Sequence, residues 1–177
     1  MLFKNIIAFN LFFCITAKKA LYTPQNKPQL KNLKMKFYLV KGRESDFRQL
    51  YPILNKTPEL ESEPYTAKLV KSFLKDKKRN LVLIAKNSNK IAGFIMAELW
   101  PEKGFSYFED LYISPEFRRN GLATTLMNEY EGICKSKGIN LISCLVLKRN
   151  RRMHRLSEKL GYSRGNEFYF YKKNINL

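Results

Sequence analysis

The spacing of apolar side chains changes along the chain and predicts where strands and helices form. Apolar runs of strand length occupy residues 36–40, 80–86, 91–100, 106–113, 139–147 and 167–172. Apolar positions recur at helical spacing in residues 47–54, 69–74, 122–133 and 150–160. The resulting order β-α-α-β-β-β-α-β-α-β predicts one mixed α/β domain that starts at Met35 and has no internal repeat.

Some runs also predict which side chains are buried. The runs "SYFEDLYI" (106–113) and "INLISCLVL" (139–147) are apolar on both faces, which is typical of strands covered on both sides. The run "EFYFYK" (167–172) is expected to close the sheet. In the second helix, the side predicted to face the core consists of Leu69, Val70, Phe73 and Leu74.

The composition is that of a folded and strongly basic domain. Hydrophobic residues make up 45% of the 177 residues, and 33 Lys and Arg against 15 Asp and Glu give a formal net charge of +18. Six of the lysines lie in residues 1–34, which contain no acidic residue, so residues 35–177 still carry 27 basic residues against 15 acidic ones. Such a surface attracts nucleic acid, membrane headgroups or a polyphosphate cofactor, and charge alone does not choose among them.

Cysteine and histidine usage favours neither a disulfide framework nor a metal site. Cys14, Cys134 and Cys144 are odd in number and form no CxxC pair, and His154 is the only histidine. Cys134 and Cys144 fall in helical and strand-like runs, where cysteine usually behaves as a small core residue. We therefore expect no bound metal.

Residues 1–34 form a separate segment with three open interpretations. The apolar run "IIAFNLFFCITA" (6–17) follows Lys4 and resembles the core of a cleavable signal, because it is shorter than the roughly 20 residues that span a bilayer. The segment is a targeting leader, a membrane tether, or a mis-assigned start before Met35. We expect no membrane span, and a cytoplasmic location, or an organellar one if the segment is a targeting leader.

The stretch "SPEFRRNGLATT" (114–125) joins a predicted strand to a predicted helix and is typical of an anion site. A helix N-terminus exposes unpaired N–H groups and a partial positive charge. Gly121 lets the backbone approach a ligand, while Arg118 and Arg119 add charge and paired donors. The sequence has neither the G-x-x-x-x-G-K-[ST] pattern of P-loops nor the G-x-G-x-x-G pattern of dinucleotide-binding folds. The pyrophosphate predicted to bind here therefore belongs to a different ligand.

The stretch "EDLYISPEFRRNGLA" (109–123) resembles the signature of the GNAT superfamily of acetyl-CoA-dependent N-acetyltransferases, Q/R-x-x-G-x-G/A. The matching residues are Arg118, Gly121 and Ala123. The resemblance extends over roughly residues 35–173. It implies a single α/β domain whose mixed, mostly antiparallel sheet has helices on both faces, and it implies acetyl-CoA as the co-substrate.

A second stretch, "NRRMHRLSEKLGY" (150–162), is similar to a downstream motif of the same superfamily. There the residue at Asn150 contacts the pantetheine arm. Met153 replaces a usual small residue, and Ser157 stands where many members carry the tyrosine that protonates the leaving thiolate. A serine hydroxyl is a poor acid, so that role is not carried over. The cofactor-binding residues implied by both motifs are Leu111, Tyr112, Ile113, Arg118, Arg119, Asn120, Gly121, Leu122, Ala123, Asn150 and Ser157.

Acetyl transfer to an amine needs a proton acceptor, a donor to the acyl oxygen and a route for the thiol to leave. An alkyl ammonium has a reference pKa of about 10.4, so a base has to remove its proton near pH 7. Glu109 and Asp110 are the candidates, and a backbone N–H between residues 111 and 113 is the candidate donor. Two routes for the departure of the thiol stay open. Either Tyr112, Tyr162 or water assists it, or it leaves unaided as a thiolate, because the reference pKa of a thiol is only about 8.5.

The acceptor of the acetyl group stays open. The stretch "YFEDLYISPEFR" (107–118) looks most like members that acetylate diamines and polyamines, and an acidic loop with Glu59, Glu61 and Glu63 suits a cation. A protein N-terminus or lysine is the alternative. An alternative from a different functional class is a basic RNA- or ribosome-binding module that uses a catalytically decayed acetyltransferase fold. We do not expect this function, because Gly121 of the cofactor motif is retained. A homodimer also stays open.

Overall fold

A computed structural model of the chain describes residues 36–56 and 65–167. The five strands are β1 (Tyr38–Lys41), β2 (Asn80–Asn87), β3 (Lys90–Trp100), β4 (Phe105–Ile113) and β5 (Leu141–Ser143). The four α-helices of this part are α2 (Phe47–Lys56), α3 (Ala67–Lys75), α4 (Leu122–Ser136) and α5 (Arg151–Lys159). Short 3₁₀ turns precede α2 (η2, Glu44–Asp46), follow β3 (η3, Pro101–Lys103) and follow β4 (η4, Pro115–Phe117).

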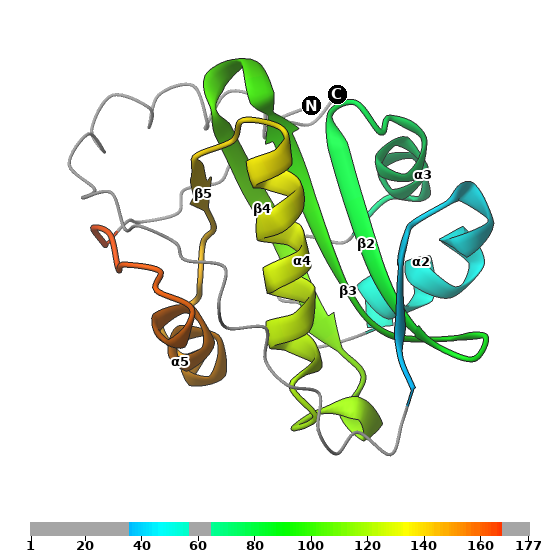
Figure 1. Ribbon diagram of the computed structural model, residues 1–177. Helices are drawn as coiled ribbons and strands as arrows, with labels where there is room; N and C mark the ends of the chain where they lie inside the picture. The colour runs from blue at the N-terminus through cyan, green and yellow to red at the C-terminus, as the bar shows by residue number, and fades with distance from the viewer. Residues whose placement is uncertain (1–35, 57–64, 168–177) are drawn as a thin grey trace, which may run out of the picture. The chain divides into compact units, whose positions relative to one another are not determined.

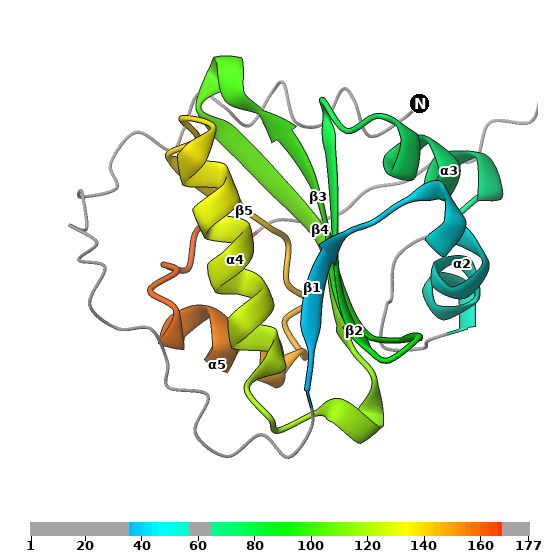
Figure 2. The ribbon, with the colours of Figure 1, turned by 45° about the vertical axis from the view of Figure 1, so that its right-hand side comes forward.

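The strands form one sheet in the order β1-β2-β3-β4-β5, in which β4 and β5 are parallel and the other neighbours are antiparallel. Helices cover both faces, with α4 on one side of the sheet and α2 and α3 on the other (Figures 1 and 2). The predicted fold class, one α/β domain with a mixed and mostly antiparallel sheet, is confirmed. The predicted leader, residues 1–34, lies outside the described residues.

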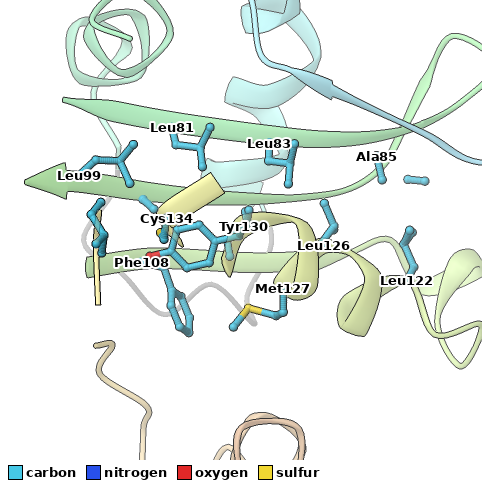
Figure 3. Close-up of a cluster of buried hydrophobic side chains, with 14 of the residues drawn as sticks. Leu81, Leu83, Ala85, Leu99, Phe108, Leu122, Leu126, Met127, Tyr130 and Cys134 are labelled. Atoms are coloured by element: carbon cyan, nitrogen blue, oxygen red, sulfur yellow. The ribbon is translucent and has the colours of Figure 1, made fainter. Parts of the chain in front are cut away.

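The α4 face of the sheet carries the larger hydrophobic core. Side chains such as Leu83 and Phe108 of the sheet pack against Leu126 and Tyr130 of α4 (Figure 3). Burial of one such side chain contributes about 1.5–3 kcal/mol to folding. The buried hydroxyls of Tyr130 and Ser106 lie 2.6 Å apart and tie α4 to β4. Partly buried side chains of α5 complete this layer, so α4 and α5 share one face.

The opposite face is covered by α2 and α3, and one predicted burial there is wrong. Val70 and Phe73 of α3 pack on Ile84 and Phe94 of the sheet, as their spacing predicts. Leu69 instead is 43% exposed. Thr66 caps the helix by accepting a hydrogen bond from the Leu69 backbone N–H, and Leu69 lies in the first turn at the edge of the face that Val70 and Phe73 bury.

The sheet is shorter at its β5 edge than the sequence predicts. The apolar run 139–147 was expected to form a buried strand, yet β5 spans only Leu141–Ser143. Leu145 and Leu147, farther along the run, are 67% and 45% exposed. Hydrophobicity alone does not supply a ladder partner, and β4 pairs with this segment at only three positions. The last predicted strand, 167–172, lies outside the described residues apart from Glu167.

Candidate active site

A β-bulge in β4 brings two consecutive carboxylates to one face of the sheet. Met96 of β3 pairs with Asp110 and Ala97 pairs with Phe108, so Glu109 is the extra residue of β4. In a regular strand, neighbouring side chains point to opposite faces, and a bulge breaks this alternation. Phe108 packs on the α4 side, whereas Asp110 contacts Tyr65 on the α3 side. The charges of Asp110 and of Glu98 of β3 both act on Glu109, so the three acids lie within electrostatic reach of one another.

This environment makes Glu109 the strongest proton acceptor candidate among the described residues. Burial raises the pKa of Glu109, and the neighbouring charges of Glu98 and Asp110 raise it further, to about 7. A carboxyl with such a pKa is partly ionised at neutral pH and binds a proton far more readily than an exposed glutamate does. The structure thus combines proximity to the strand end with a basicity that suits general base catalysis.

Asp110 has a different environment from its neighbour. It is buried, and the hydroxyl of Tyr65 donates a hydrogen bond of 2.5 Å to its Oδ2 atom. Burial raises the pKa of Asp110, and the hydrogen bond from Tyr65 acts in the opposite direction. Burial and the carboxylate of Asp110 in turn raise the pKa of Tyr65, so Tyr65 remains a donor. The tandem carboxylates therefore differ: one is hydrogen-bonded and the other is basic.

Beyond Tyr107, no strand of the described residues pairs with the β4 edge that lies next to these carboxylates. The ladder between β4 and β5 ends at the pair Tyr107 and Ser143. The N–H of Ser114 donates to the Ala92 carbonyl of β3. Amides alternate between the two edges of a strand, so the N–H groups of Leu111 and Ile113 point away from β3. Within the predicted stretch 111–113, these two are the available donors to an acyl oxygen, while the Tyr112 N–H faces β3.

The turn that follows β4 has the shape of an anion site. The Arg118 Nε atom donates to the Ile113 carbonyl at 2.9 Å, which anchors the turn to the open strand edge. Arg119 and Gly121 have left-handed backbones, with φ of 63° and 75°. The Asn120 side chain donates to the Phe117 and Arg118 carbonyls. These contacts hold the backbone in a tight curl directly before α4.

The residues present fit a pyrophosphate and a pantetheine arm. Gly121 is the N-cap of α4, and a Cβ at this position would meet no atom of the described residues within 4 Å. The first turn of α4, with Leu122 and Ala123, contains no acidic residue that would oppose an anion. The Ser157 hydroxyl is buried and has no hydrogen-bond partner among the described residues, which suits a polar group of a bound ligand.

Asn150 also caps α5, which the sequence analysis did not predict. Its side-chain oxygen accepts a hydrogen bond from the Met153 N–H at 3.1 Å. Its NH₂ group remains available to contact a pantetheine carbonyl. The helix ends before Gly161, whose φ of 84° reverses the chain, as predicted.

The two tyrosines proposed to assist the thiol lie in different layers. The Tyr112 ring is buried and stacks on Phe94, with centroids 5.4 Å apart, in the core on the α2 and α3 side. The Tyr162 hydroxyl donates to Glu131 of α4 at 2.9 Å, and burial and the Glu131 carboxylate raise the Tyr162 pKa. Tyr162 thereby links α5 to α4. Neither role in proton transfer is tested by this geometry, and both stay predictions.

A family model described as "Acetyltransferase (GNAT) family" matches residues 47–162. The chain belongs to the GNAT family. Thialysine N-epsilon-acetyltransferase from Caenorhabditis elegans is 38% identical over 58 residues, which cover 33% of this chain and 36% of the relative. Aminoglycoside N(6')-acetyltransferase type 1 from Acinetobacter genomosp. 13 is 29% identical over 70 residues, which cover 40% and 48%. The matches therefore span between a third and half of the length of these curated relatives.

Solved structures share the fold of this GNAT domain. AAC(6')-Iy, in complex with the bisubstrate analogue CoA-S-monomethyl-acetylneamine, has a TM-score of 0.66 and 15% identity, with 79% of this chain and 99% of that chain covered. PaiA N-acetyltransferase from Thermoplasma acidophilum, in complex with coenzyme A, has a TM-score of 0.64 and 21% identity, with 72% and 89% covered. At these identities the likeness concerns the fold.

Three residues of the candidate site were missed in the sequence. Tyr65 lies 45 residues from its partner Asp110, so no local pattern connects them. Glu98 is the one acid inside the apolar run 91–100, which was a usable signal. Tyr107 lies on the same strand as Glu109, and the charge of Glu109 helps raise its pKa.

The described residues also bear on metals and membranes. Across residues 36–56 and 65–167, no group of three or more His, Cys, Asp and Glu side chains is arranged to hold a metal ion. Over the same ranges, no helix has the length and apolar character needed to cross a membrane.

Proposed function

We propose that this GNAT protein transfers an acetyl group from acetyl-CoA to a primary amine by direct attack in a ternary complex. The observation that carries the proposal is the course of β4. In one continuous segment it presents Glu109, with a pKa of about 7, then the open amides of Leu111 and Ile113, and then the turn before α4. A base, an oxyanion donor and an anion site thus follow one another along a single strand.

Each group has one task in this mechanism. Acetyl-CoA, when bound, supplies the activated acetyl group. Glu109 accepts a proton from the ammonium form of the substrate, directly or through water, and so generates the nucleophilic amine. The N–H groups of Leu111 and Ile113 stabilise negative charge on the acyl oxygen. The N-terminus of α4 and the Arg119 guanidinium hold the pyrophosphate, and the Ser157 hydroxyl contacts the pantetheine arm.

The acceptor is best described as a small molecule with a cationic primary amine. Glu98, Glu109 and Asp110 gather on the α3 side of the bulge and attract an ammonium group. Two curated relatives have names that specify primary amines of small molecules, thialysine and an aminoglycoside. A protein amine is the alternative, and the E. coli ribosomal-protein-S18-alanine N-acetyltransferase shares the fold with a TM-score of 0.64.

The test is turnover with saturating acetyl-CoA across polyamines, lysine analogues, aminoglycosides and peptides with free N-termini, detected as free thiol. We expect turnover with at least one small polycationic amine and weaker turnover with peptides. Binding of acetyl-CoA without turnover on any amine would contradict the proposal. A thermal shift with acetyl-CoA, measured in parallel, separates a failed substrate panel from a failed cofactor site.

One observation favours the second candidate, an RNA- or ribosome-binding module. Exposed cations gather on and beside α5, and these are Lys148, Arg151, Arg152, Arg155 and Lys159. RNA affinity that falls steeply with salt, together with no shift by acetyl-CoA, would favour this function. Size-exclusion chromatography measures whether the protein forms a homodimer. We propose a cytoplasmic location, or an organellar one if residues 1–34 act as a targeting leader.

A further inference from the structure

We propose that Tyr65 is a positioning residue of this site: its hydroxyl holds Asp110 as a fixed, ionised carboxylate, so that proton acceptance falls to Glu109. This inference rests on the proposed function, because it assigns different roles to the two carboxylates of that reaction. Tyr65 touches no reacting atom in the proposal. It acts through Asp110.

The geometry of the contact is specific. Tyr65 and Asp110 are 7% and 8% exposed, and their hydrogen bond of 2.5 Å lies between two buried groups. A charged acceptor in such a place strengthens the bond and makes its loss costly. Tyr65 directly precedes Thr66, the N-cap of α3, so its backbone is held by the start of that helix. The hydroxyl therefore reaches the bulge from the residue directly before the N-cap of α3.

The bulge explains why such a device is useful. It places the adjacent Glu109 and Asp110 on one face, where two carboxylates compete for one proton. The other titratable groups around them in the described residues are Glu98 of β3 and Tyr107 of β4. Tyr65 is the group that the structure shows donating a hydrogen bond to this pair, and it donates to Asp110. A hydrogen-bond donor that contacts only Asp110 stabilises the ionised form of that carboxyl. The two carboxyls are then no longer equivalent, and the shared proton resides on Glu109.

The first test follows the carboxyl groups directly. Protein labelled with ¹³C at aspartate and glutamate side-chain carboxyls is titrated by NMR as wild type, Tyr65→Phe and Tyr130→Phe. Tyr130→Phe is the matched control, because it also removes a buried tyrosine hydroxyl, but on the α4 face next to Ser106. In Tyr65→Phe we expect the Asp110 midpoint to rise by about one pH unit and the two carboxyls to titrate together. An Asp110 midpoint equal to that of wild type would overturn the proposal.

The second test uses the pH dependence of turnover. In Tyr65→Phe we expect kcat to fall about 10-fold at pH 7.5, with KM for the amine changed less than threefold. We also expect the acid limb of the profile to become shallower and to move to lower pH, which a merely loosened fold would not produce. In an Asp110→Asn background, Tyr65→Phe should lower kcat by less than a further twofold, because the side chain at position 110 is already neutral.

The outcomes separate this inference from the proposed function. A moved Asp110 midpoint in a protein that acetylates no amine would uphold the pairing and refute the function. Turnover in wild type with fully additive effects of Tyr65→Phe and Asp110→Asn would uphold the function and refute the pairing. A profile of Tyr65→Phe that is uniformly lowered without any change of shape would also refute it.

Discussion

Replacing Glu109 by glutamine should both abolish most activity and stabilise the fold above neutral pH. The amide keeps the size of the side chain and removes its charge. Loss of a general base costs about 10²–10⁴-fold in rate. In wild type, kcat/KM should rise with pH through about 7, where Glu109 loses its proton. In Glu109→Gln this limb should disappear together with the rate.

The sign of the stability effect follows from the direction of the pKa change. The pKa of Glu109 is raised from 4.5 to about 7, so the folded state binds this proton more tightly than the unfolded chain. Stability is therefore greatest below the unfolded pKa and is lost as the pH rises from about 4.5 to about 7. Linkage limits this loss to about 3 kcal/mol. We expect about 2 kcal/mol, because Glu109 is partly exposed and coupled to Asp110.

The measurement is urea unfolding of wild type, Glu109→Gln and Glu129→Gln at pH 5 and pH 8, with turnover measured on the same samples. Glu129 lies exposed on α4 and serves as the matched control for removing one carboxylate. At pH 8, Glu109→Gln should exceed wild type by about 2 kcal/mol, which corresponds to a rise in Tm of about 4–8 °C. Activity within tenfold of wild type, or equal stability at pH 8, would refute the reasoning.

Four further predictions concern the cofactor site and the domain boundary. Gly121→Ala should cost about 1 kcal/mol through its φ of 75°, and Gly121→Glu should also abolish acetyl-CoA binding; micromolar binding by a folded Gly121→Glu protein contradicts the motif assignment. Arg119→Gly should gain about 1 kcal/mol, since a non-glycine residue leaves the left-handed region, yet weaken acetyl-CoA binding in calorimetry; unchanged affinity removes Arg119 from the site. Ser157→Ala should raise stability by about 1 kcal/mol, because an unpartnered buried hydroxyl is removed, and lower acetyl-CoA affinity several-fold; unchanged affinity shows that the hydroxyl faces no ligand. A chain that starts at Met35 should unfold cooperatively and keep its acetyl-CoA affinity, whereas a broad transition would show that residues 1–34 pack as part of the domain.

Several features of this GNAT domain follow from local sequence because their physical causes are local. Strand and helix periods depend on neighbouring residues, so β2, β3, β4 and α4 lie where the pattern predicts them. Gly121 and Gly161 were recognisable because only glycine adopts their left-handed backbones at little cost. The start of α5 lies where the helical spacing predicts it, and the Asn150 side chain caps it through the backbone three residues on.

Other expectations failed where a distant partner decides the outcome. The apolar run 139–147 has strand composition throughout, but a strand needs a ladder, and β4 offers only three pairs. Leu69 has helical spacing, but it lies at the edge of the face that Val70, Phe73 and Leu74 bury, and the packing of α3 on the sheet leaves it exposed. Spacing within a segment does not show where the surface that covers it ends.

The sequence by itself determined the α/β class, the order of the described elements and the position of the turn before α4. Only the tertiary structure decided how the acids of the candidate site differ from one another. The bulge at Glu109 arises from the register between β3 and β4, and the partner of Asp110 arrives from a residue 45 positions away. Proton affinity depends on burial and on charges within a few ångströms, and chain folding alone brings those groups together.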